Sequence, residues 1–409
     1  MQSSQSPDRD FEAAVVGGGP VGLVTALLLA REGFSTALVE KAADVETDLR
    51  ASTFHPPTLD LLDDIGLGRE LIAQGLICPQ WQVRLHPEGE RAVFDLGVIA
   101  DATRHPFRLQ CEQWRLSRIV LAALRSEPVA ETFFATEVVD MTQDEDGVTL
   151  ALNGAKSSTK SPATLRARFV VGADGARSVV RQALGFPLEG ETYPETTLLA
   201  TTTFPFEDHL EGLSSIAYCW KAGGNFSLLR VPGRWRVSIY PREDLPIETQ
   251  ITDEAIQASL REIVAQPNGY EILEMRPYRV HKRIAPHYHR GRVALAGDAA
   301  HLNSPSGGMG LNGGVHDAFE LVAAFHDIRA GAPLAQRLDL YERRRRPVAL
   351  EQIIAQADAN RARMREKDPE KRREILAGLQ AIAADRVRAR AHLLRTSMIA
   401  GLREAASVG

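Results

Sequence analysis

The first 42 residues carry the clearest pattern of hydrophobic and polar positions in the chain. FEAAVVGGG (11–19) is a short apolar run typical of a buried strand, and PVGLVTALLLAREGF (20–34) is a longer apolar segment with a glycine just past its last turn, as helices commonly have. STALVEKA (35–42) has the pattern of a second strand. These residues predict a strand-helix-strand unit at the start of the chain.

Further elements of both kinds follow. Helical periodicity covers residues 58–76 and 113–126, whereas VVDMTQDEDGVTLAL (138–152) predicts two strands joined at an acidic turn that contains glycine. ARFVVGADGARSVVRQALG (167–185) predicts a strand, a tight turn and the start of a helix. Strands and helices alternate over this part of the chain, which favours an α/β fold.

The pattern changes in the middle of the chain. Residues 185–285 consist mostly of segments rich in strand-forming residues, with one clear helix near 253–266. The order of strand, loop and helix returns at GRVALAGDAAH (291–301), and the chain is helical and charged from about residue 334 onward. We therefore expect a second layer built from a sheet, followed by helices.

Length and composition narrow the classes of protein. With 409 residues the chain exceeds the usual size of one domain, and its net charge of −5 provides no general basic surface for nucleic acid. Three cysteines lack metal-ligand or disulfide spacing, so neither a zinc site nor any other metal site is expected. No signal peptide or long apolar segment is recognisable. We expect a cytoplasmic protein without a membrane span.

The motif GGGPVG, directly after the first predicted strand, indicates dinucleotide binding. Gly17, Gly19 and Gly22 satisfy the G-x-G-x-x-G pattern, in which missing side chains permit a tight turn and a close approach of pyrophosphate to a helix start. Glu40 ends the next strand, where a carboxylate can accept hydrogen bonds from ribose. The motif alone leaves a nicotinamide and a flavin dinucleotide both open.

A second glycine-rich stretch favours the flavin. AGDAAHLNSPSGGMGLNGGVHDAFEL (296–321) places five glycines in the eight positions 307–314, directly before a helical pattern. Such a loop can present bare backbone N–H groups to a planar, anionic ring edge. Asp298 ends the preceding strand, where its carboxylate can hold ribityl hydroxyls. We expect the ring to occupy the space that the missing side chains leave.

Together with GADGARSVVR (172–181), these two motifs resemble the class A flavoprotein monooxygenases, which include p-hydroxybenzoate hydroxylase and the phenol hydroxylases. The resemblance implies an α/β fold like that of p-hydroxybenzoate hydroxylase, in which a Rossmann-like FAD-binding domain carries an inserted β-rich substrate domain and a helical C-terminal region. The expected division is an FAD-binding domain over 1–80, 109–184 and 286–345, a substrate domain over 81–108 and 185–285, and helices over 346–409.

The resemblance also implies roles for single residues. Glu40 is similar to the ribose-binding acid, Asp298 to the ribityl-binding acid, and Asp174 to a residue involved in flavin and nicotinamide binding. Gln113 falls where a polar group meets the ribityl or phosphate region, Pro305 lines the ring, and residues 308–312 face its N1 and O2 side. The full set expected to bind the cofactor is Gly17, Gly19, Pro20, Val21, Gly22, Glu40, Lys41, Arg50, Gln113, Asp174, Gly297, Asp298, Pro305, Gly308, Gly310, Leu311 and Asn312.

The chemistry that the resemblance implies is hydroxylation of a small phenolic or heteroaromatic ring. NADH or NADPH reduces a noncovalent FAD, O2 adds at the flavin C4a atom, and the resulting hydroperoxide delivers an OH group. Pro305, His55 and Tyr218 are the candidate catalytic residues. Strands containing Tyr218, Trp220, Phe226 and Trp235 suggest an aromatic-lined cavity.

Three further expectations accompany this reading. Only one nucleotide fingerprint is present, so NAD(P)H is expected to bind transiently elsewhere, and the chain is expected to be a monomer or a homodimer. His301 is expected to be structural, and the arginines of YERRRRPVALE (341–351) to be solvated. The alternatives are a flavin-dependent reductase or halogenase on the same scaffold, although the WxWxIP segment of halogenases is missing, and a flavin-binding sensor without catalysis.

Overall fold

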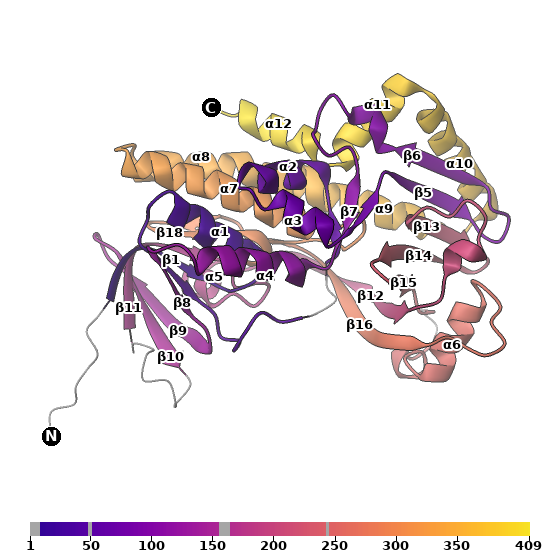
Figure 1. Cartoon of the computed structure of the whole chain (residues 1–409), viewed down its shortest axis with the longest axis horizontal. Coiled ribbons are helices and arrows are strands. Elements are labelled where there is room, and N and C mark those ends of the chain that lie inside the picture. The colour runs from indigo at the N-terminus through magenta and orange to yellow at the C-terminus, as the bar shows by residue number, and fades with distance from the viewer. Residues whose placement is uncertain (1–8, 48–50, 155–163, 243–244) are drawn as a thin grey trace.

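The computed structural model describes residues 9–47, 51–154, 164–242 and 245–409. Within these ranges two large sheets lie side by side, and a small three-stranded sheet lies near the place where they meet (Figure 1). The C-terminal helices run along the top of the view and extend over both large sheets (Figure 1). The chain crosses between the two large sheets several times, so neither corresponds to a single stretch of sequence.

The first large sheet has a parallel centre in the order β18-β11-β1-β2-β8. Ala13, Ala14 and Val15 in its middle strand are fully buried, as expected of a parallel sheet covered on both faces. The strands of this sheet are β1 (Arg9–Val16), β2 (Thr36–Val39), β8 (Ala130–Phe133), β9 (Thr136–Gln143), β10 (Val148–Gly154), β11 (Thr164–Gly172), β17 (His289–Arg290) and β18 (Val293–Leu295).

Four helices accompany the parallel strands. Helix α1 (Pro20–Arg31) contacts both α4 (Gln113–Leu124) and α7 (Gly310–Arg329), and its Leu23 and Leu27 are fully buried. On another part of the sheet, α5 (Val179–Ala183) lies against β9. Helix α1 begins just after β1, and the first turns of α7 pack against Val21 of α1 and against Gly297, two residues past β18. The N-termini of both helices therefore lie at the carboxyl edge of the sheet.

The second large sheet has the order β19-β16-β12-β15-β14-β13-β5-β6 and is mainly antiparallel. Apolar residues of one face form a core with α6 (Asp253–Arg261), including Ile256 and Leu260 of that helix. The strands are β5 (Gln80–Leu85), β6 (Arg91–Asp95), β12 (Glu189–Thr202), β13 (Ile216–Lys221), β14 (Gly224–Val231), β15 (Arg234–Ile239), β16 (Ile272–Ile284) and β19 (His301–Leu302).

The small sheet and the C-terminal helices connect these layers. The small sheet contains β3 (Thr53–Phe54), β7 (Arg108–Gln110) and β4 (Leu76–Cys78), in that order. Pro347 is the last residue of α8 and directly precedes a π-helical segment, because proline supplies no N–H to the regular ladder. The remaining helices are α2 (Pro56–Asp64), α3 (Gly68–Ala73), α8 (Leu334–Pro347), α9 (Ala355–Met364), α10 (Pro369–Ala384), α11 (Arg386–Thr396) and α12 (Ile399–Ser407).

The predicted fold class is confirmed: a parallel sheet with helices, an antiparallel second sheet and a helical C-terminal region are all present. The helix predicted over 58–76 is instead two helices, α2 and α3, followed by β4. The turn at Gly66, which has a φ of +73°, separates the two helices because only glycine adopts that backbone conformation readily.

The aromatic residues of the second sheet do not line one cavity. Phe226 and Trp235 belong to the core beneath α6. Tyr218 and Trp220 lie on the opposite face, where they pack with side chains from the C-terminal helices. Successive side chains of a strand point to opposite faces, so the four aromatic residues are divided between two environments.

Candidate functional site

The loop after β1 uses its three fingerprint glycines in two different ways. A Cβ on Gly17 would lie 2.4 Å from the carbonyl oxygen of Ala173, and a Cβ on Gly22 only 1.9 Å from the carbonyl oxygen of Gly17. A Cβ on Gly19, in contrast, would meet no protein atom within 4 Å. Gly17 and Gly22 therefore allow the loop to pack on itself and on β11, whereas Gly19 leaves open space in which a ligand can approach the backbone.

Helix α1 begins at this open position without a side-chain cap. Gly19 is the N-cap residue and Pro20 is the first helical residue. The backbone N–H groups of the first turn have no partners within the helix, and the helix dipole places partial positive charge there. This combination is suited to the pyrophosphate of a dinucleotide. The backbone of Val21 and Gly22, which belong to this first turn, is thus part of the candidate phosphate site.

Glu40 is held beside the same loop. Its carboxylate accepts hydrogen bonds from the backbone N–H of Gly18 at 2.5 Å and of Ala42 at 2.7 Å. These two bonds orient the carboxylate, which has room for further donors because an ionised carboxylate offers about four acceptor sites. The geometry fits the predicted role in binding ribose hydroxyls. Lys41 follows directly and is exposed.

Asp174 lies against the loop from the neighbouring strand. A Cβ on Gly17 would come within 2.9 Å of its Cα atom. Its Oδ2 atom accepts hydrogen bonds from the N–H groups of Val179 and Val180 at the start of α5, and its Oδ1 atom is buried without a partner. Burial raises the pKa of this carboxyl above its ordinary value. Asp174 therefore fixes the turn after β11 and has one acceptor atom to spare.

The second glycine-rich stretch brings α7 against α1. A Cβ on Gly314 would lie 2.5 Å from the side chain of Val21, and a Cβ on Gly297 would lie 3.0 Å from it. Asp298 follows Gly297 in a short 3-10 turn (Gly297–Ala299) after β18 and is exposed. The starts of two helices and an exposed carboxylate thus converge at the carboxyl edge of the parallel sheet, which is where α/β sheets of this kind bind ligands.

Three other glycines of this stretch, Gly308, Gly310 and Gly313, are explained by protein packing. The expectation that a ring occupies the space of the missing side chains is wrong for these three, since protein atoms already lie within 2.8 Å of where each Cβ would be. The closest neighbours are Thr53 Cβ for Gly308, Asn303 Oδ1 for Gly310 and Ile353 Cδ1 for Gly313. These glycines let Thr53 and Ile353 from distant segments, and Asn303 from the same stretch, press against the loop and so determine where its backbone lies.

Two predicted site residues hold this loop from inside the protein. The side chain of Asn312 accepts a hydrogen bond from the His55 N–H at 2.8 Å and donates to the carbonyl oxygens of Thr53 and Gly308. His55 Nε2 lies 2.8 Å from the carbonyl oxygen of Gly307, and the residue is fully buried. Burial keeps the pKa of His55 well below its ordinary value, so the ring is neutral and donates from Nε2. The structure places both side chains as supports of the loop.

A buried charged group beneath α7 was not expected. Asp317 Oδ2 lies 2.8 Å from His301 Nε2, and Asp317 Oδ1 accepts a hydrogen bond from Arg345 Nε at 2.7 Å. The structural role expected for His301 agrees with this arrangement. The expectation of solvated arginines in 341–351 is wrong for Arg345, whose exposed fraction is 1%. A run of four arginines resembles a solvated helix face, and no local signal distinguishes the buried one.

The remaining predicted site residues lie on several different elements. Pro305 is exposed, and its carbonyl oxygen accepts a hydrogen bond from the N–H of Gly308 at 2.9 Å. Gln113 is the first residue of α4, and its N–H donates to the carbonyl oxygen of Ala51. Leu311 is buried in the first turn of α7. Tyr218 lies on β13 of the second sheet and forms a hydrogen bond with Arg108. Arg50 lies outside the described residues.

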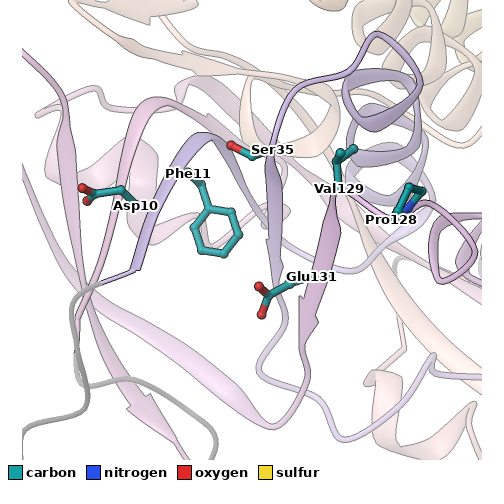
Figure 2. A pocket seen from close by; sticks show the side chains of 6 residues that line it. All are labelled: Asp10, Phe11, Ser35, Pro128, Val129 and Glu131. Carbon is teal, nitrogen blue, oxygen red and sulfur yellow. The ribbon is translucent and has the colours of Figure 1, made fainter.

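A shallow pocket lies at the opposite end of the parallel strands. Figure 2 shows its lining, which consists of Asp10, Phe11, Ser35, Pro128, Val129 and Glu131. These residues lie at or near the amino ends of β1, β2 and β8. The fingerprint loop and Glu40 lie at the carboxyl ends of β1 and β2, so this pocket has no part in the candidate dinucleotide site.

The fold and this site together define a class of protein. A family described as "FAD binding domain" matches residues 10–357 of the chain. The match covers more than half of the chain, and the chain belongs to this family, whose members of similar sequence are flavin-dependent aromatic monooxygenases. The predicted family and the predicted enzyme class are thereby confirmed.

Individual relatives agree with this assignment. The chain is 33% identical to the para-nitrophenol 4-monooxygenase of Pseudomonas sp. strain WBC-3 over 393 residues, which is 95% of this chain and 96% of that protein. It is 31% identical to a 6-hydroxy-3-succinoylpyridine 3-monooxygenase of Pseudomonas putida, covering 85% and 87% of the two chains. The crystal structure of a p-nitrophenol 4-monooxygenase from Pseudomonas putida DLL-E4 superposes with a TM-score of 0.88 at 34% identity, covering 96% and 98%.

The described residues contain neither a candidate membrane span nor a candidate metal site. None of the helices in the described ranges is both long and apolar enough to cross a membrane. In the same ranges, His, Cys, Asp and Glu side chains form no group of three or more placed to hold a metal ion.

Proposed function

We propose that this enzyme hydroxylates a small phenolic or heteroaromatic ring, using O2, NADH or NADPH, and one noncovalently bound FAD. The observation that carries the proposal is the convergence of the uncapped start of α1, Glu40 and the start of α7 at one edge of the parallel sheet. The relatives named above act on a nitrophenol and on a hydroxylated pyridine, which supports a ring of this size and kind.

The residues present fit FAD in its extended form. The N–H groups at the start of α1 would bind the pyrophosphate, Glu40 would accept hydrogen bonds from the adenosine ribose, and Asp298 would accept them from the ribityl chain. The backbone N–H groups at the start of α7 would lie at the N1 and O2 side of the ring. FAD, when bound, supplies the activation of dioxygen, which no side chain of the protein can perform.

The second sheet supplies a polar surface toward the substrate side. Thr197, Ser227 and Ser238 are at most 6% exposed and lie on the face opposite α6. Buried hydroxyl groups need hydrogen-bond partners, and the hydroxyls of Thr197 and Ser238 both interact with the side chain of Tyr278, so this face carries a connected polar network. In the proposed reaction these side chains orient the substrate ring, while the sheet itself excludes bulk water from the reacting centre.

The proposal is tested with the purified enzyme loaded with FAD. A panel of phenols, hydroxybenzoates and N-heteroaromatic acids is scored for stimulated oxidation of NADH and NADPH, and each active compound is then turned over under heavy-isotope dioxygen. We expect one labelled oxygen atom in the product. A labelled product identifies a monooxygenase, whereas a reduced or halogenated product, or stimulated oxidation without labelled product, would contradict the proposal in favour of the alternatives.

A further inference from the structure

One buried carboxylate joins the two segments on which FAD is expected. It belongs to Asp317 on α7, and with His301 and Arg345 it forms what we call the Asp317 group, whose three residues are each at most 1% exposed. Asp317 Oδ2 accepts a hydrogen bond from the backbone N–H of Gly297 at 3.1 Å and lies 2.8 Å from His301 Nε2. Gly297 begins the short turn that carries Asp298, the acid expected to bind the ribityl chain. Asp317 therefore holds the turn before that acid.

Arg345 connects the same carboxylate to the start of α7. Its Nε atom donates a hydrogen bond to Asp317 Oδ1 at 2.7 Å, and its Nη2 atom donates to the carbonyl oxygen of Gly313 at 3.3 Å. Gly313 lies in the first turn of α7, whose backbone N–H groups are expected at the N1 and O2 side of the flavin ring. The Asp317 group is thus bonded to the backbone of both segments. Because its side chains are buried, it acts on a ligand through that backbone and through its charge.

The Asp317 group contains two opposite charges. Burial alone would raise the pKa of Asp317, but Arg345 and His301 hold it below its ordinary value, so the carboxylate is ionised and His301 donates to it from Nε2. The guanidinium of Arg345 supplies the matching positive charge. Reduced flavin carries a negative charge at its N1 and O2 side that oxidised flavin lacks. Since buried charges are screened much less than exposed ones, the balance between Asp317 and Arg345 affects which form of the flavin the site favours.

Stability alone does not account for the Asp317 group. A buried ion pair loses hydration that its own attraction often fails to recover, and apolar residues in its place are often neutral or stabilising. Among the described residues, Arg345 Nη1 and His301 Nδ1 are buried without hydrogen-bond partners, which adds a further cost. The neighbouring hydrogen bond between α8 and β18, from the Tyr341 hydroxyl to the carbonyl oxygen of Leu295 at 2.7 Å, joins two elements with neutral groups. A charged group beside the expected flavin therefore has a use that a neutral hydrogen bond does not provide.

We propose that Asp317 is a positioning residue of the flavin site. Its carboxylate fixes the turn before Asp298 against the start of α7, and its charge cancels that of Arg345, so that the site does not hold the anionic reduced flavin too strongly. The Asp317 group thereby contributes both to FAD affinity and to the reduction potential of the bound flavin. The inference rests on the proposed function only in that it needs FAD at this edge of the sheet, and it depends on no step of the hydroxylation.

The test measures two quantities for each variant. FAD affinity is obtained by fluorescence titration of the apoprotein, and the midpoint potential of the holoenzyme by reduction with dithionite beside a reference dye; about 30 mV corresponds to a tenfold change in relative affinity for reduced and oxidised flavin. The variants are Asp317→Asn, the double variant Asp317→Asn/Arg345→Gln, His301→Leu and His301→Gln. The matched control is Glu320→Gln, which breaks the 2.8 Å ion pair with Arg344 between the same two helices, about one turn further from the start of α7.

Asp317→Asn leaves the charge of Arg345 unbalanced, so it should favour reduced over oxidised flavin by about tenfold and raise the midpoint potential by about 30 mV. The double variant removes both charges and should return this ratio to within about threefold of wild type. His301→Leu keeps the charges but removes a donor to Asp317, so it should weaken both forms of the flavin equally, by about 3- to 10-fold. His301→Gln, whose amide can still donate, should restore most of that affinity, and Glu320→Gln should change neither quantity by more than about twofold.

Three results would overturn the inference: a midpoint potential of Asp317→Asn at or below that of wild type, a double variant shifted as far as the single one, or unchanged FAD affinity in His301→Leu. If Asp317→Asn does not fold, the comparison of His301→Leu with His301→Gln still decides the positioning role. Failure of the proposed function is visible separately, since an enzyme whose variants behave as expected but that forms no oxygen-labelled product would retain the role of Asp317 and disprove the hydroxylation. Labelled product with a wild-type potential in Asp317→Asn would do the reverse.

Discussion

Gly19 and Gly22 provide a matched pair of substitutions that separates ligand binding from packing. Both belong to the fingerprint loop, and each is changed to alanine, which adds one methyl group. At Gly22 the added carbon would lie 1.9 Å from the carbonyl oxygen of Gly17, about 1.5 Å short of the 3.4 Å at which an ordinary contact begins. At Gly19 the added carbon meets no protein atom within 4 Å, and the φ of −72° suits alanine.

The two substitutions are expected to change different quantities: Gly22→Ala the stability of the apoprotein, and Gly19→Ala the affinity for FAD. Gly22→Ala should lower the free energy of unfolding of the apoprotein by about 1–3 kcal/mol or more, the usual cost of overpacking, because the neighbour is backbone that cannot rotate away. Gly19→Ala should leave that free energy within about 1 kcal/mol of wild type, as a change at an N-cap position allows. Gly19→Ala should weaken FAD binding by about tenfold or more, because a loss of about 1.4 kcal/mol of binding free energy lowers the affinity tenfold.

Urea unfolding of the apoproteins and FAD titrations followed by flavin fluorescence measure the two quantities independently. If Gly19→Ala binds FAD as tightly as wild type, the pyrophosphate does not approach this loop, and the assignment of the dinucleotide site fails. A wild-type unfolding midpoint for Gly22→Ala would show that the loop relaxes freely, which would refute the packing argument while leaving the site assignment intact.

Three further predictions follow from the same structure. Asp298→Ala should weaken FAD retention by about 10- to 150-fold through loss of a charge-assisted acceptor, and unchanged flavin content after dialysis would count against this role. Arg345→Met should cost about 3–5 kcal/mol of stability in urea, because it leaves Asp317 buried without its partner. Burial alone would raise the pKa of Asp317, but Arg345 and His301 hold it below its ordinary value. The stability that this group contributes is therefore present above about pH 4 and is lost as the pH falls further. The free energies of unfolding of wild type and Arg345→Met should accordingly converge at low pH. Finally, the true substrate should accelerate anaerobic flavin reduction by NAD(P)H at least about tenfold in stopped flow, and equal rates with and without it would exclude control by substrate.

Local sequence was sufficient for the parts of the fold and site that depend on neighbouring residues. The fingerprint loop lies within ten residues of the strand before it and the helix after it, so the spacing of Gly17, Gly19 and Gly22 already predicts a turn and an uncapped helix start. Glu40 is at the end of the next strand for the same reason. The change from mixed to strand-rich pattern near residue 185 likewise predicted the second sheet.

Tertiary structure alone decided which distant residues share an environment. Arg345 is one of four consecutive arginines, and only its position beneath α7, beside Asp317, makes it the buried one. His55 lies about 250 positions before Gly307, so nothing local indicates that it supports the glycine-rich loop. Arg108 on β7 and Thr396 at the end of α11 belong to separate elements, and the hydrogen bond from Arg108 to the Thr396 carbonyl forms only because of how the C-terminal helices pack. A sequence pattern indicates which side of a helix or strand is apolar, but it does not indicate which element packs against that side. The packing of the elements decides this, and it brings together side chains that are far apart in the sequence.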